Sequence, residues 1–160
     1  MSQRSNALAE TLEQGVRALV AFASTLNDAE WKTAVPHDWR PVGVIVHHVG
    51  NIMPLEIDVA MKMAAGNPIV GVTWDLVHQI NAEHARANRD ATKEEALDLL
   101  RTNCTAATTA IRALTDGQLD RTVPNSMYAD APLTCQFFLE DHAVRHSYHH
   151  LAKLRSALKK

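Results

Sequence analysis

Apolar residues recur at intervals of three and four over most of this chain, and no stretch alternates apolar and polar residues as a half-buried strand would. The pattern predicts helices over residues 6–26, 41–65, 73–88, 92–115 and 133–158. In the first of these, the apolar set is Leu8, Leu12, Val16, Leu19, Val20 and Phe22. Four long helices and a shorter one predict an all-α fold, an antiparallel four-helix bundle with a short extra helix in a long connection.

Turn-forming residues separate these helices. Residues 27–41 are rich in tryptophan and proline and are predicted to be an ordered loop. The sequence Gly66-Asn67-Pro68 ends the second helix, and residues 116–132 are predicted to be a long loop because they contain one glycine and two prolines. No internal repeat or second compositional region is visible, so we expect residues 1–160 to form a single domain.

The composition indicates which classes of binding partner and which cellular compartment to expect. A net charge of −2 among 160 residues and a pI of about 6.5 give no sign of a nucleic-acid-binding surface. No apolar run is long enough for a membrane span, and the polar N-terminus does not resemble a signal peptide. Cys104 and Cys135 have no metal-binding or redox spacing and are expected to be small buried apolar residues. We therefore expect a cytoplasmic protein.

The last predicted helix carries four of the nine histidines: His142, His146, His149 and His150. Residues four apart on a helix share a face, so His146 and His150 can point at the same place. Such a pair supplies half of a transition-metal site. His149 lies about 80° from the direction of this pair and suits a supporting or surface role better. His142 continues the column one turn earlier and is expected to line the site or to be buried with a partner.

The second predicted helix offers the third ligand. His47 and His48 are adjacent and therefore point about 100° apart, so they do not easily serve one metal together. His48 shares the apolar face of Ile45 and Ile52 and can point into the bundle, whereas His47 falls nearer the edge of that face. Three imidazoles suit zinc, nickel or another first-row divalent ion and leave a coordination position open for water or substrate.

Three segments resemble the DinB-like superfamily of metal-binding helical bundles, in the branch of YfiT-type proteins. Trp39, Pro41 and the sequence His47-His48-Val49 resemble the tryptophan-led second helix with its ligand histidine. The sequence from His146 to Ala152 resembles the final-helix pattern of two histidines, and residues 80–86 resemble a connecting segment of some members. With the order of the helices, the resemblance covers nearly the whole chain.

The resemblance implies a ligand set of His146, His150 and one of the two adjacent histidines. Counting from Trp39 favours His47, whereas counting from the histidine-valine pair favours His48. We assign His48, because it also agrees with the helical phase.

The family also implies a function. Its members include transferases and isomerases that use low-molecular-weight thiols such as bacillithiol or mycothiol. The expectation is therefore a divalent-metal-dependent enzyme acting on a small-molecule substrate, either a thiol-dependent S-transferase or a metal-dependent hydrolase. The alternative is a non-catalytic, stress-related bundle that binds a metal or a small molecule. Bundles of this type often pair, and the apolar first helix could contact a second copy, but the sequence does not establish a homodimer.

The sequence assigns no catalytic base. Glu56 lies near the face of His48 and could fix the tautomer of a ligand imidazole, although a solvated helix face explains it equally well. His78 and His84 are expected to be surface histidines on the short extra helix, and Tyr148 is expected to pack away from the ligand face. No serine-centred elbow or phosphate-binding loop appears.

Overall fold

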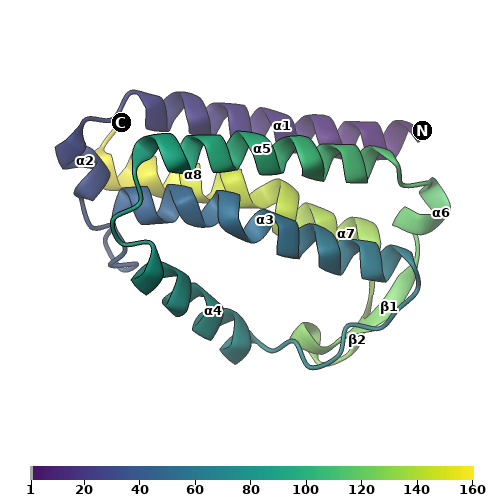
Figure 1. Ribbon diagram of the computed structural model, residues 1–160. Helices are drawn as coiled ribbons and strands as arrows, with labels where there is room; N and C mark the ends of the chain where they lie inside the picture. The colour runs from purple at the N-terminus through teal and green to yellow at the C-terminus, as the bar shows by residue number, and fades with distance from the viewer. Residues whose placement is uncertain (1) are drawn as a thin grey trace.

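The computed structural model describes residues 2–160 (Figure 1). It is an all-α four-helix bundle with a small two-stranded sheet. The long helices are α1 (Gln3–Ser24), α3 (Val42–Ala64) and α5 (Lys93–Arg112), and the fourth position is filled by α7 (Cys135–Leu139), a π-helical turn (Glu140–Val144) and α8 (Arg145–Leu158). The shorter elements are α2 (Asp28–Lys32), α4 (Trp74–Ala87), α6 (Asp116–Leu119), β1 (Thr122–Asn125), a 3-10 turn (Ser126–Tyr128) and β2 (Ala131–Thr134).

The four long segments pack around one apolar core. Helix α3 lies against α5 and the α7–α8 segment, and α1 lies against α5 and α8 (Figure 1). The largest side chains that are fully enclosed in this core include Leu12, Leu19, Ile45, Met53, Leu100 and Leu139. None of the described helices combines the length and apolar character that crossing a bilayer requires. The bundle confirms the fold class predicted from the helical periodicity.

Helix α4 is the short extra helix in the connection between α3 and α5. It lies beside α3, outside the bundle (Figure 1), and His84 is the only residue of α4 that is buried. Trp74 and Leu76 remain partly exposed. This helix therefore covers one side of α3 without belonging to the core.

Two segments differ from the expected loops. Residues 27–41 contain α2, which begins at a capping box formed by Asn27 and Glu30. Residues 116–132 contain α6 and β1, and β1 pairs antiparallel with β2 through Val123 and Leu133. The loop expectation was wrong there because each strand has only four residues, too few to show alternation, and each contains a proline. The capping box was the visible signal for α2.

The predicted last helix begins at Cys135 rather than Leu133, and its interior is not uniform. A π-helical turn spans Glu140–Val144, between α7 and α8. Each such turn accommodates an extra residue and so shifts the phase of the side chains on its two sides. The column of His142, His146 and His150 expected for a regular helix is therefore broken after its first member.

Candidate metal centre

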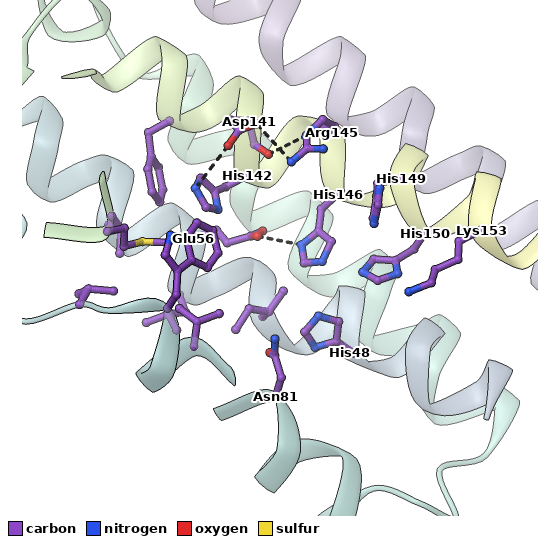
Figure 2. A pocket seen from close by; sticks show the side chains of 18 of the residues that line it. His48, Glu56, Asn81, Asp141, His142, Arg145, His146, His149, His150 and Lys153 are labelled. Carbon is purple, nitrogen blue, oxygen red and sulfur yellow. Dashed lines mark hydrogen bonds and ion pairs between the residues drawn. The ribbon is translucent and has the colours of Figure 1, made fainter. Parts of the chain in front are cut away.

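His48, His146 and His150 converge between α3 and α8. One ring nitrogen of each lies within 4.8 Å of the others. The ring centroid of His48 is 5.2 Å from that of His146 and 5.6 Å from that of His150, and the latter two are 4.8 Å apart. Figure 2 shows the three rings facing a common space, one from α3 and two from α8. These three histidines are called the triad below.

The chemistry of the triad fits a divalent transition metal. His48 and His150 are 4% and 5% exposed, and burial, followed by the nearby His146, lowers the pKa of each to about 2. Both imidazoles are therefore neutral, the form that binds metals. Each also has a buried Nδ1 without a hydrogen-bond partner. A group of neutral, incompletely paired imidazoles is the donor set that zinc, nickel and similar ions require.

Glu56 fixes the third imidazole. Its carboxylate Oε1 accepts a hydrogen bond of 2.8 Å from Nδ1 of His146, and only 8% of Glu56 is exposed (Figure 2). Nδ1 then carries the proton, which leaves Nε2 of His146 with a free lone pair. Of the two alternatives left open for Glu56, the structure shows the contact with a histidine and not a solvated face. A carboxylate in this position can orient an imidazole that binds a metal.

Substituting Glu56 by glutamine should lower the affinity for a divalent metal by about 10- to 100-fold. The amide still fills the space but loses the negative charge that keeps the proton on Nδ1 of His146. Competition titration with a metal-sensitive dye measures the effect. Glu94→Gln, at an exposed position of α5, is the matched control. Equal affinities of the two variants would show that Glu56 does not support the triad.

His47 points away from the triad. Its Nδ1 lies 2.8 Å from Nε2 of His84, and the two rings are stacked with centroids 5.0 Å apart. His84 is buried, so the expectation of a surface position was wrong for it, while His78 is exposed as expected. The contact ties α4 to α3. It also explains why His48, and not its neighbour, reaches the triad.

His142 belongs to a different network. Its Nε2 lies 2.8 Å from the hydroxyl of Tyr128, which donates a 3.0 Å hydrogen bond to Asp141. The imidazole stacks on Phe138 with centroids 4.2 Å apart. The π-helical turn places His142 in this network one turn before the triad, lining the same space with a partner, as expected.

A cavity of about 330 Å³ lies beside the triad. Its wall comes from α3, α4, the 3-10 turn, the α7–α8 segment and the loop before α3. His142 and Glu56 lie toward one end of the view in Figure 2, and His149, His150 and Lys153 toward the other. The cavity gives a small molecule access to the triad.

Asp38, Arg40 and Lys153 form an ion cluster that no local sequence pattern predicts. Nε and Nη2 of Arg40 donate to the two oxygens of Asp38 at 2.5 and 2.9 Å, and Nζ of Lys153 donates at 2.5 Å. Burial raises the pKa of Asp38, but these two cations outweigh it and hold the pKa well below its usual value. His37 and Trp39, on either side, have left-handed backbones with φ of 64° and 67°. Arg40 and Lys153 line the cavity, whereas Asp38 does not.

His149, Tyr148 and the two cysteines are not part of the triad. His149 lines the cavity and packs edge-on to His150, with centroids 5.1 Å apart. The hydroxyl of Tyr148 donates to the carbonyl of Thr11, which confirms its packing role. Cys104 and Cys135 are buried free thiols, as expected.

A model of the DinB superfamily matches residues 11–154. YfiT from Bacillus subtilis, described as a probable metal-dependent hydrolase with an unusual four-helix bundle topology, has a similar structure. Its TM-score is 0.77 at 18% identity, over 99% of this chain and 89% of that one. A mycothiol-dependent maleylpyruvate isomerase is similar with a TM-score of 0.71 at 12% identity, over 96% of this chain and 63% of that one. No curated protein sequence matches significantly. The family model spans most of the chain, and the chain therefore belongs to the DinB superfamily.

Proposed function

We propose that this protein is a divalent-metal-dependent enzyme that joins a low-molecular-weight thiol to an electrophilic small molecule, with His48, His146 and His150 as the metal ligands. The observation that carries the proposal is the convergence of these imidazoles on the wall of a cavity large enough for a small substrate. Three protein ligands leave a coordination position open, which is typical of catalytic rather than structural sites.

The metal and the protein residues of the site have different roles in this proposal. A zinc or nickel ion held by the triad supplies a Lewis acid that lowers the pKa of a thiol. The protein keeps His48 and His150 neutral by burial and orients His146 through Glu56. The fixed rings hold their donor atoms in place before a substrate enters, which reduces the entropy lost on binding.

The carboxylates of the cavity favour thiol transfer over hydrolysis. Hydrolysis is helped by a general base within reach of the attacking water. Glu56 already accepts from His146, and Asp141 accepts from Tyr128 and pairs with Arg145. Thiol transfer needs no further base, because a thiol is acidic enough for the metal alone to ionise it. The two similar structures, a probable metal-dependent hydrolase and a thiol-dependent isomerase, make both chemistries reasonable to test.

The test is an assay of zinc- and nickel-loaded protein with monochlorobimane and a panel of thiols: cysteine, glutathione, coenzyme A, bacillithiol and mycothiol. The thiol sulfur forms a bond to the chloromethyl carbon, chloride leaves and the thiol proton passes to water. We expect at least one thiol to react about tenfold faster, or more, than with metal-free protein.

Para-nitrophenyl acetate without a thiol provides the comparison for hydrolysis. Metal-dependent ester cleavage with no thiol transfer would replace the proposal by the hydrolase. Protein that binds the metal and catalyses neither reaction would be a non-catalytic metal-binding bundle.

A further inference from the structure

The two ends of the cavity beside the triad differ chemically. We infer that Arg40 and Lys153 form a carboxylate-binding subsite, and that the cavity accepts a small molecule with an apolar body and a carboxylate. The inference rests on the proposed function in one respect: it identifies this molecule as either the thiol or the electrophile of the proposed reaction.

The apolar end surrounds His142. Phe138 stacks on its imidazole, and the ring of Trp74 is 6.4 Å from the imidazole between centroids, with 22° between the planes. Val77 and Met127 add to the same cavity wall. Trp74 is 44% exposed, so its indole still has free surface for a ligand. Aromatic and aliphatic side chains of this kind bury an apolar group and gain from its removal from water.

The cationic end contains an unsatisfied donor. Arg40 uses Nε and Nη2 for Asp38, but its Nη1 is buried and has no hydrogen-bond partner. A buried N–H group of a charged side chain without an acceptor costs free energy, and native structures rarely leave one unpaired. Nζ of Lys153 has three N–H bonds and a single partner, Asp38. Both residues line the cavity, so a ligand oxygen can supply the missing acceptors.

The charge of this end favours a carboxylate. Arg40 and Lys153 carry two positive charges, and Asp38 carries one negative charge. One positive charge is left, which a single carboxylate neutralises, whereas a doubly charged phosphate would leave a negative charge unpaired. Guanidinium and ammonium groups form their strongest hydrogen bonds with such anions. The other charged residues of the cavity wall are already paired: Glu56 accepts a hydrogen bond from His146, and Asp141 forms an ion pair with Arg145.

The subsite lies next to the triad. Lys153 follows His150 by three residues on α8 and shares its face. Arg40 lines the same cavity as His48 and His150. Figure 2 shows the triad between Lys153 and His142, the residue at the apolar end. A molecule that spans the two ends therefore passes the metal position.

The test measures binding of phenylacetate and of its neutral analogue phenylacetamide to metal-free protein by calorimetry. Removing the metal matters because a carboxylate could otherwise bind the ion itself. We expect phenylacetate to bind at least about tenfold more tightly than the amide. Arg40→Gln and Lys153→Gln should each lower the affinity for phenylacetate about tenfold and leave that for phenylacetamide unchanged. Arg101→Gln, an exposed cation on α5, is the matched control and should change neither.

Equal binding of the two probes would overturn the inference, as would loss of carboxylate affinity in Arg101→Gln to the same extent. Arg40 is largely buried, so thermal unfolding of Arg40→Gln is measured alongside. If that variant is unfolded, Lys153→Gln decides alone, because Lys153 is one-third exposed and its removal is tolerable for the fold.

Kinetics on metal-loaded protein identify which reactant carries the carboxylate. One arm compares mercaptopropionate with mercaptoethanol as the thiol, and the other compares chloroacetate with chloroacetamide as the electrophile. If the anionic compound has a lower KM than its neutral analogue in one arm, and Lys153→Gln abolishes this difference, then the reactant tested in that arm carries the carboxylate. No such preference in either arm contradicts the inference. Carboxylate-selective binding without any catalysed reaction would instead refute only the proposed function.

Discussion

Alanine in place of His48, His146 or His150 should each lower the affinity for zinc or nickel about a thousand-fold. A zinc-binding free energy of about 12 kcal/mol shared among three imidazoles is roughly 4 kcal/mol per ligand, which corresponds to that factor. The three nitrogens lie within 4.8 Å of one another, so each substitution removes one of three donors that meet at a single position. Metal content after dialysis and competition titration measure the loss.

Two histidine variants serve as controls. His47→Ala removes a residue next to His48 that pairs with His84 instead. His149→Ala removes a residue next to His150 that lines the cavity and packs edge-on against His150 but is not part of the triad. Both should retain the metal with affinity within a few-fold of wild type. Full retention of the metal by all three triad variants would show that the site lies elsewhere, and loss in His47→Ala alone would move the third ligand to that residue.

Acid should destabilise the metal-free protein strongly. Burial lowers the pKa of His48 and of His150 to about 2, from the ordinary histidine value of 6.5. Below pH 6.5 the unfolded chain therefore binds protons that the folded chain does not, so the free energy of unfolding falls as the pH falls. Each histidine lowers the free energy of unfolding by up to about 1.4 kcal/mol for each pH unit of acidification. Relative to its value at about pH 6.5, the free energy of unfolding falls because of the pair by about 2 kcal/mol at about pH 5.5 and by about 5 kcal/mol at about pH 4.5.

Urea denaturation of the metal-free protein across this pH range measures the effect. The double variant His48→Gln/His150→Gln removes both titrating groups and should show a much flatter dependence. A residual slope is expected from His84, since burial lowers its pKa to about 4. If the double variant loses stability with acid as steeply as wild type, these two histidines are not the groups that resist protonation in the folded state.

Local sequence signals accounted for much of the site. The spacing of His146 and His150 predicts that both lie on one face of α8, and the position of Glu56 near the face of His48 allows a contact with a ligand imidazole, one of two alternatives for this residue. Both follow from helical periodicity, which depends only on residues within a few positions of each other. The same periodicity predicts His142 one turn before the pair, where it lines the cavity with Tyr128 as a partner, but it does not reveal the π-helical turn that interrupts the regular helix there.

The choice between His47 and His48 needed the tertiary structure. Adjacent residues on a helix differ by about 100° in direction, and the apolar pattern alone favoured His48 only through its phase. In the structure, His47 pairs with His84 of α4, whereas His48 points into the bundle and packs against His150.

The sequence by itself determined the helical bundle and one face of the candidate site. Both depend on the short-range spacing of apolar residues and histidines, because this spacing determines which face of each helix points toward the core. Only the tertiary structure revealed the contact between Asp38 and Lys153, which are 115 positions apart, and the unpaired Nη1 of Arg40 beside them. The physical reason is that such contacts depend on which helix ends the packed core brings together, and no local pattern along the chain records that choice.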